Sequence, residues 1–183
     1  MTVVVVVRKG RLVRSASGGV LEADSSSTLI LTEEMNLLVD TGGEDPKGLI
    51  RDLEPYGVDA VVFTHGHQDH VGNARAIAET FHPEFYAHER EAGSIPVDVD
   101  PVDSFDPPEG VEVIETPGHT PGHISVVVED RIVIAGDACP TPDNALERVP
   151  PAISWDRELA EESLRKVLSY PVVIPGHGIH LKR

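Results

Sequence analysis

Residues 61–70 read VVFTHGHQDH, which places three histidines and one aspartate directly behind a run of apolar residues. The mostly apolar run from Val58 to Phe63 is typical of a buried strand, so the polar cluster is expected on the loop that leaves its end. Alternate residues of an extended chain face the same way, which turns His65 and His67 toward one point. Packing alone gives no reason for such a cluster, whereas neutral imidazoles and carboxylates are ligands for zinc, iron or manganese.

Asp69 and His70, at the end of the cluster, are predicted to lie at the start of a helix near Asn73. Four ligands within six residues cannot close comfortably around one ion, so we predict a pair of ions with further ligands from elsewhere in the chain. Three candidates each follow an apolar run and are flanked by glycine, which lets the backbone approach closely. These candidates are His119, Asp137 and His177. Taken singly, each is equally consistent with a structural role.

Two other polar residues are predicted to support the cluster rather than to bind an ion. Asp40, in LLVDTGG, either caps the turn that Gly42 and Gly43 make or holds the ring N–H of a ligating histidine. His123 lies four residues after His119 on a turn rich in proline and glycine, where the two rings need not converge. We therefore expect His123 to be a structural partner of the site.

Short apolar runs predict a chain rich in strands. The expected strands are Val3–Val7, Thr28–Leu31, Asn36–Val39, Val58–Phe63, Val111–Ile114, Ile124–Val128, Ile132–Ala135 and Val172–Ile174. Helices are expected from Asp45 to about Leu53, from about Asn73 to Phe81, and from Asp156 to about Leu168. This order favours sheets covered by helices over an all-strand sandwich or a helical bundle.

Two proline-rich segments fit none of these elements. Residues 93–110 are expected to form a surface connection. Residues Pro140 to Pro151 follow Asp137 closely, so they are either a surface connection or a wall of a substrate cleft.

Composition restricts the classes of partner. The 183 residues, 40% of them hydrophobic, are predicted to form a single domain over residues 1–183. A formal net charge of −16 repels phosphate backbones, so we expect a small-molecule substrate and no nucleic acid. Cys139 is the single cysteine, which rules out an intrachain disulfide and favours a cytoplasmic location. No run approaches the ~20 apolar residues that span a membrane, so no membrane partner is expected. The oligomeric state is not predicted.

Taken in order, the motifs HGHQDH (65–70), TPGHT (116–120), GD (136–137) and PGHG (175–178), preceded by LLVDTGG (37–43), resemble the metallo-β-lactamase superfamily over nearly the whole chain. The resemblance implies an α/β fold, the αβ/βα four-layer sandwich, in which two mixed β-sheets are flanked by helices and carry a dinuclear site at their edges. It implies that His65, His67 and His119 hold one metal ion, that Asp69, His70 and His177 hold the other, and that Asp137 bridges them.

Within the superfamily the pattern is most similar to hydroxyacylglutathione hydrolases, the glyoxalase II group, and related small hydrolases. β-Lactamases commonly replace the residues equivalent to His70 and Asp137, and flavodiiron proteins carry glutamate in place of His67. The chain ends six residues after His177, so we expect no C-terminal substrate-binding extension. Because no such extension is expected and the chain is strongly acidic, we expect it to bind anionic glutathione poorly.

The resemblance implies hydrolysis of an ester or thioester by a hydroxide shared between two divalent ions. Zinc is the expected metal, with iron or manganese as alternatives. Asp69 is predicted to be a catalytic residue that also accepts the proton released during attack. Three alternatives remain: a mononuclear iron persulfide dioxygenase, a phosphodiester nuclease, and a metal-binding module without catalysis.

Overall fold

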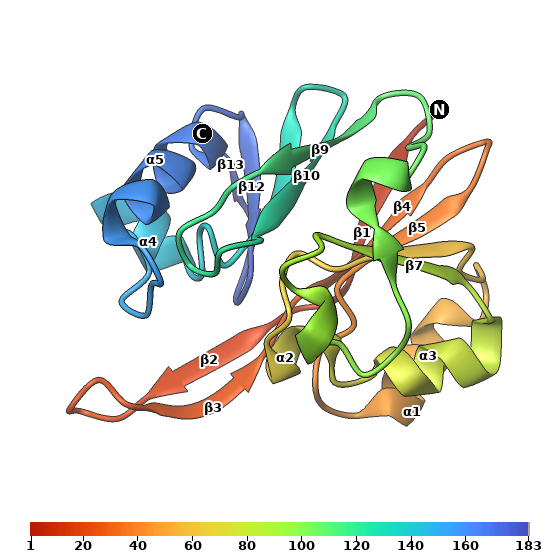
Figure 1. Cartoon of the computed structure of the whole chain (residues 1–183), viewed down its shortest axis with the longest axis horizontal. Coiled ribbons are helices and arrows are strands. Elements are labelled where there is room, and N and C mark those ends of the chain that lie inside the picture. Colours follow the sequence, from red (N-terminus) through yellow and green to blue (C-terminus); the bar gives the residue numbers. More distant parts are fainter. Residues whose placement is uncertain (183) are drawn as a thin grey trace.

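The computed structural model describes residues 1–182, in which two β-sheets pack face to face between two layers of helices (Figure 1). The first sheet has the strand order β1-β4-β5-β6-β7-β8. Its strands are β1 (Val3–Arg8), β4 (Ser27–Leu31), β5 (Asn36–Val39), β6 (Ala60–Val62), β7 (Glu84–Ala87) and β8 (Asp100–Pro101). The three pairs from β5 to β8 are parallel and the other two are antiparallel, so the sheet is mixed.

The second sheet is also mixed and has the order β13-β12-β11-β10-β9. Its strands are β9 (Val111–Glu115), β10 (Ile124–Val128), β11 (Ile132–Gly136), β12 (Val172–Pro175) and β13 (Leu181–Lys182). Only β11 and β12 pair in parallel. Together the two sheets and their helices confirm the four-layer α/β sandwich.

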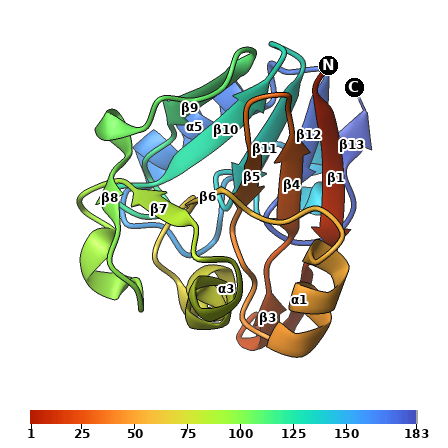
Figure 2. The ribbon, with the colours of Figure 1, turned by 90° about the vertical axis from the view of Figure 1, so that its right-hand side faces the viewer.

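Helices α1 (Pro46–Leu53) and α3 (Ala74–Phe81) cover the outer face of the first sheet (Figures 1 and 2). The sequence sets the start of α1, because the Asp45 side chain accepts a hydrogen bond from Gly48 N and Pro46 occupies the first turn. Helices α4 (Pro142–Glu147) and α5 (Arg157–Val167) cover the second sheet, and Asp156 caps α5 as predicted. Two 3-10 turns, η1 (Ala92–Ser94) and η2 (Val102–Ser104), lie in the proline-rich segment after β7.

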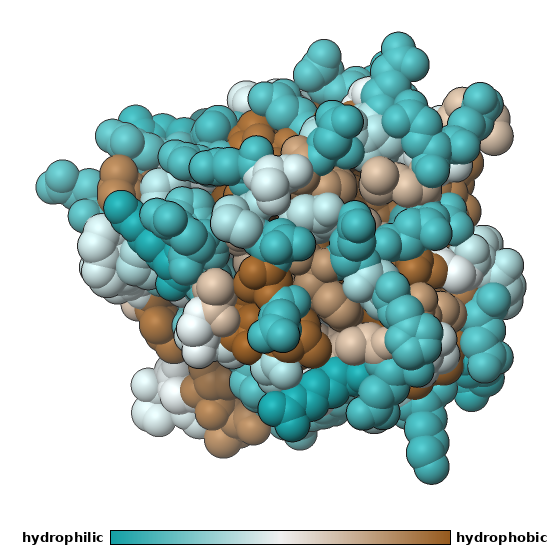
Figure 3. All heavy atoms as spheres, turned by 45° about the vertical axis from the view of Figure 1, so that its right-hand side comes forward, coloured by the Kyte–Doolittle hydropathy of each residue, from teal (hydrophilic) through white to brown (hydrophobic). Residues whose placement is uncertain are grey.

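Successive residues of the central strands pack into different hydrophobic cores on the two faces of the sheet. Leu29 and Val61 pack against α1 and α3, whereas Ile30 and Val62 pack between the two sheets. A strand that is buried on both faces needs apolar residues at every position, which explains the continuous runs in the sequence. On the face shown in Figure 3, hydrophilic residues dominate the periphery and hydrophobic patches lie between them. No helix within residues 1–182 has the length and apolar character needed to cross a membrane.

The structure adds strands β7, β8 and β13, which the sequence did not predict, and β8 lies within residues 93–110, where only a surface connection was expected. It also corrects three further expectations. Strands β2 (Arg11–Arg14) and β3 (Val20–Asp24), which the sequence did not predict, form a hairpin that projects from the body (Figure 1). Asp69 and His70 lie on a separate short helix, α2 (Gln68–Val71), rather than at the start of α3. The segment from Pro140 to Pro151 contains α4 and is therefore more than a surface connection.

Candidate metal centre

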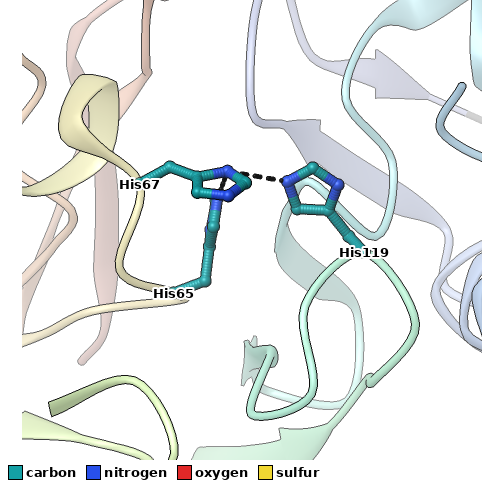
Figure 4. A group of neighbouring side chains, drawn as sticks. All are labelled: His65, His67 and His119. Carbon is teal, nitrogen blue, oxygen red and sulfur yellow. Dashed lines mark hydrogen bonds between the residues drawn. The ribbon is translucent and has the colours of Figure 1, made fainter. Parts of the chain in front are cut away.

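The cluster after β6 meets three other loops at one edge of the two sheets. These loops follow β9, β11 and β12 and carry His119, Asp137 and His177. His65, His67 and His119 form one group of donor atoms that lie within 4.8 Å of one another (Figure 4). His67 Nδ1 is 3.0 Å from both His65 Nε2 and His119 Nε2. Residues 52 positions apart in the chain thus present three ring nitrogens to one point.

A second group contains Asp69, His70 and His177, and a third combines His65 and His70 with Asp137. Asp137 faces both ends of the cluster. Its Oδ2 is 3.4 Å from His119 Nε2, and its Oδ1 is 3.4 Å from His177 Nε2 and 3.5 Å from His70 Nε2. The structure therefore brings all seven predicted ligands together, with Asp137 between the two sets.

Hydrogen bonds on the far side of three imidazole rings fix their orientation. His119 Nδ1 donates to the carbonyl of Ile153 at 2.7 Å, and His177 Nδ1 donates to the carbonyl of Asp24 at 2.8 Å. His70 Nδ1 donates to Asp40 Oδ2 at 2.7 Å. Because carbonyls and carboxylates only accept hydrogen bonds, these Nδ1 atoms carry the hydrogen, and each neutral ring keeps a lone pair on Nε2.

His65 is held in the same way through Thr64. The Thr64 hydroxyl donates to Asp40 Oδ2 at 2.7 Å, so it accepts from His65 Nδ1 at 3.1 Å. His65 Nε2 therefore also keeps a lone pair. His67 Nδ1 faces the lone pairs of His65 and His119, and one ring hydrogen can serve at most one of them.

Two further atoms at the centre of the cluster are also suited to bind cations. His70 Nε2 and Asp137 Oδ1 are buried and have no hydrogen-bond partner. Leaving such atoms unsatisfied is costly, and native structures usually provide a partner, a water or an ion. Converging lone pairs from imidazoles and carboxylates are the donor set that divalent transition metals bind.

Burial and nearby charges shift the pKa values of these groups in different directions. Burial holds the pKa of His65 well below its usual value, and it also lowers the pKa of His67. Burial alone would lower the pKa of His70, but Asp40 and Asp137 outweigh it and raise that pKa well above 6.5. Burial alone would raise the pKa of Asp137, but the neighbouring rings of His177 and His70 outweigh it and lower that pKa well below 3.8.

The structure places the two predicted supporting residues behind the donor atoms. Asp40 is 2% exposed and bonds His70 and both the amide and hydroxyl of Thr64, not the turn at Gly42 and Gly43. His123 Nε2 accepts from the backbone amide of Asp137 at 3.0 Å, and its Nδ1 is 2.9 Å from Thr116 Oγ1. Both ring nitrogens of His123 are thus used away from the donor groups.

Three contributors to the site were not predicted from sequence. Ile153 and Asp24 act through backbone carbonyls, which leave no side-chain signature. Thr64 could have been found, because it lies directly between the buried strand and His65. The Asp24 carboxylate also accepts from Gly43 N at 2.6 Å and so ties β3 to the loop after Asp40.

A cavity of about 130 Å³ opens onto the donor atoms. Five of the predicted ligands and Arg14 line it, together with apolar residues from the β2–β3 hairpin and from the segment after Asp137. The lining residues are Leu12, Arg14, Val20, Ala23, His67, Asp69, His119, Asp137, Pro140, Pro151, Ile153 and His177. Both ends of the proline-rich segment, Pro140 and Pro151, therefore form part of the cleft wall.

The chain is similar to known proteins in sequence and in fold. The sequence model of the metallo-beta-lactamase superfamily matches residues 21–177. The chain is 37% identical over 148 residues to the "Probable metallo-hydrolase MJ0296" of Methanocaldococcus jannaschii, covering 77% of this chain and 70% of that protein. It is 29% identical over 151 residues to an N-acyl homoserine lactonase of a Bacillus species, covering 71% of this chain and 60% of that protein.

Among solved structures, the fold is similar to TTHA1623 in a di-iron-bound form. The TM-score is 0.71, with 26% sequence identity, and the match covers 86% of this chain and 89% of the other.

Proposed function

Because the chain belongs to the metallo-beta-lactamase superfamily, we propose that it is a hydrolase that cleaves an ester or thioester at a centre of two divalent metal ions. The observation that carries the proposal is the position of Asp137, whose two oxygens face His119 on one side and His177 and His70 on the other. One carboxylate between two sets of donors could serve as a ligand to both ions of a pair. We propose the ligand sets His65, His67, His119 and Asp69, His70, His177, with Asp137 shared.

Bound divalent ions would supply Lewis acidity and lower the pKa of water from 15.7 to near 7. The lining of the cavity is consistent with water as the nucleophile, because none of the described residues that line it is Ser, Thr or Cys. The imidazoles held by Ile153, Asp24 and Asp40 keep the donor atoms fixed before substrate arrives. Such preorganisation avoids reorganisation during the reaction.

Asp69 is the proposed proton acceptor. Its side chain is 21% exposed, its Oδ2 lies 3.4 Å from His177 Nε2, and it lines the cavity. It is therefore both close to the donor atoms and open to the space that substrate would enter. The side chain of Asp137, by contrast, is 11% exposed and faces ring nitrogens on both sides.

The cavity walls favour a substrate with an apolar acyl part. Leu12, Val20 and Ala23 come from the hairpin, and Pro151 and Ile153 from the opposite wall. Arg14 is the one cationic residue among the lining residues. The net charge of −16 disfavours polyanionic substrates such as nucleic acids. The similarity to an N-acyl homoserine lactonase supports ester chemistry, since a lactone is a cyclic ester.

Zinc is the proposed native metal, with iron and manganese as alternatives that suit the same donors. The di-iron form of the similar structure shows that a related fold accepts iron. Metal analysis of protein isolated without added ions separates these choices. One equivalent of iron per chain, together with oxygen consumption, would instead favour a persulfide dioxygenase.

The proposal is tested with a panel of esters, lactones and thioesters of increasing acyl length. We expect hydrolysis that a chelator abolishes and that added Zn²⁺ restores. Hydrolysis that persists after the metal has been shown to be gone would contradict the proposal. The panel also contains a phosphodiester and a persulfide, on which we expect no turnover.

A further inference from the structure

A buried carboxylate outside the donor set connects the two loops that carry the first group of histidines. Glu91 follows β7 and is only 5% exposed. Its Oε2 accepts a hydrogen bond from Gly66 N at 2.9 Å, and its Oε1 accepts one from Gly122 N at 2.9 Å. Gly66 lies between His65 and His67, and Gly122 lies three residues after His119. One side chain therefore joins both loops.

Both glycines leave the space that this side chain fills. A Cβ atom at Gly66 would lie 2.7 Å from Ser94 Cβ and 3.4 Å from Glu91 Oε2. A Cβ atom at Gly122 would lie 3.0 Å from Glu91 Cγ and 2.9 Å from His88 Nδ1. A side chain at Gly122 would therefore press on the Glu91 side chain. One at Gly66 would clash with Ser94 and press on the Glu91 carbonyl oxygen, 3.2 Å away, so the fit at both loops is steric as well as polar.

The backbone of Glu91 is itself fixed. Its amide donates to the carbonyl of His88, and its carbonyl accepts from Ser94 N, both at 2.9 Å. A carboxylate that accepts from backbone amides forms stronger hydrogen bonds than a neutral acceptor does. Glu91 thus holds the loop of His65 and His67 at a set distance from the loop of His119.

We propose that Glu91 is a positioning residue that sets the spacing between His119 and the His65–His67 pair, and so the affinity of that group for its metal ion. The inference rests on the proposed metal centre. Glu91 hydrogen-bonds to neither α2, which carries Asp69 and His70, nor the loop of His177. Its loss therefore weakens one of the two ion sites and spares the other.

The test is a titration of the metal-free full chain with Co²⁺ alone. Isothermal calorimetry and absorption spectra monitor the binding. Variants His119→Ala and His177→Ala each delete one binding step and so identify which step belongs to which site. We then expect Glu91→Gln to weaken binding at the His65–His67–His119 site by about 10–100-fold, as is typical for residues that support ligands. The amide keeps the size of the side chain but turns one acceptor into a donor that faces a backbone N–H.

Glu89→Gln is the matched control, because Glu89 is exposed and the same charge is removed two residues away. We expect it to bind both ions as the wild type does. Glu91→Asp keeps the charge but shortens the reach, so it too should weaken the first site selectively. It also decides the question if Glu91→Gln does not fold.

Equal weakening of both sites, or unchanged binding in Glu91→Gln and Glu91→Asp, would overturn the inference. In that case Glu91 would support the fold without setting the spacing of the histidines. Wild-type protein that binds no Co²⁺ would overturn the proposed metal centre as well. The two failures are therefore distinguishable in one experiment.

Discussion

At the scale of single residues, Asp137 is the link between the two groups of donors. Its position between His119 and His177 follows from β11, which ends at Gly136 and delivers the next residue to the edge where the other loops meet. The backbone amide of Asp137 donates to His123, which fixes the carboxylate from behind. Exchange of this one side chain should therefore affect both ions.

Asp137→Asn is expected to reduce the bound metal from two equivalents to one or fewer. The neutral amide has no negative charge. Its NH₂ group, which replaces one carboxylate oxygen, is a hydrogen-bond donor and cannot bind a cation. We expect kcat/KM for the best ester to fall by more than the ~10–100-fold typical of residues that only support a ligand. Asp130→Asn, in the exposed turn between β10 and β11, is the control. Two equivalents of metal retained in Asp137→Asn would contradict the bridging role.

Asp69→Asn separates ligation from proton transfer. If Asp69 accepts the proton released during attack, kcat should fall by about 10²–10⁴-fold even in samples that contain two equivalents of metal. Metal content and initial rates are measured on the same preparation. A full rate at unchanged metal content would remove Asp69 from the mechanism.

At the scale of elements, the β2–β3 hairpin forms one wall of the cavity through Leu12, Val20 and Ala23. Leu21 belongs to the same hairpin, but it is 65% exposed and is not among the residues that line the cavity. The hairpin thus provides two leucines for comparison, of which Leu12 lines the cavity and Leu21 does not.

Leu12→Ser is expected to raise KM by about 10-fold for esters with long acyl chains, because about 1–2 kcal/mol of apolar contact is lost. Acetyl esters should be little affected. Leu21→Ser serves as the control and should leave KM unchanged for both classes. An equal effect of the two substitutions, or none for long chains, would show that the hairpin does not contact the acyl group.

Most strands of the two sheets could be predicted because burial on both faces requires unbroken apolar runs, as in Ile124–Val128. Strands β7, β8 and β13 are short and lack such a run, and the sequence did not predict them. The hairpin could not, because RLVR and VLEAD are largely exposed and give no core pattern. Helix α2 is a single turn of four residues and is too short to show a helical period. Contacts with distant segments hold α2, because the backbone amides of Ser25 and Thr41 donate to the carbonyls of Asp69 and His70.

The candidate ligands could be predicted because each follows a strand and is flanked by glycine or by another ligand. The partners that orient their rings could be predicted only in part. The sequence supports two interpretations of Asp40 equally, and the structure shows its carboxylate at His70 rather than at the glycine turn. The carbonyls of Ile153 and Asp24 depend on the packing of distant segments, which no local pattern encodes.

At the scale of the whole molecule, metal binding should be linked to stability and to pH. In the metal-free protein the pKa of His70 is raised well above 6.5, because Asp40 and Asp137 outweigh the effect of burial. A raised folded-state pKa stabilises the fold below the unfolded-state value, and that stabilisation is lost as pH rises through the folded-state pKa. Metal ions must displace this proton, so their affinity rises with pH.

We therefore expect the difference in Tm between metal-loaded and chelator-treated protein to grow between about pH 5.5 and pH 8. Thermal unfolding is measured for both forms at each pH, with the free Zn²⁺ concentration of the metal-loaded form held constant. A difference that stays constant, or that shrinks as pH rises, would contradict the proposed competition between protons and metal at the donor atoms.

The central claim is that seven side chains from four loops hold two divalent ions. The most direct test is the metal content of the full chain, isolated without added ions and then equilibrated with Zn²⁺ and freed of excess. Inductively coupled plasma mass spectrometry should find two tightly held equivalents in the wild type. Fewer than one equivalent after this treatment would contradict the account, because the converging lone pairs would then have no cation to bind.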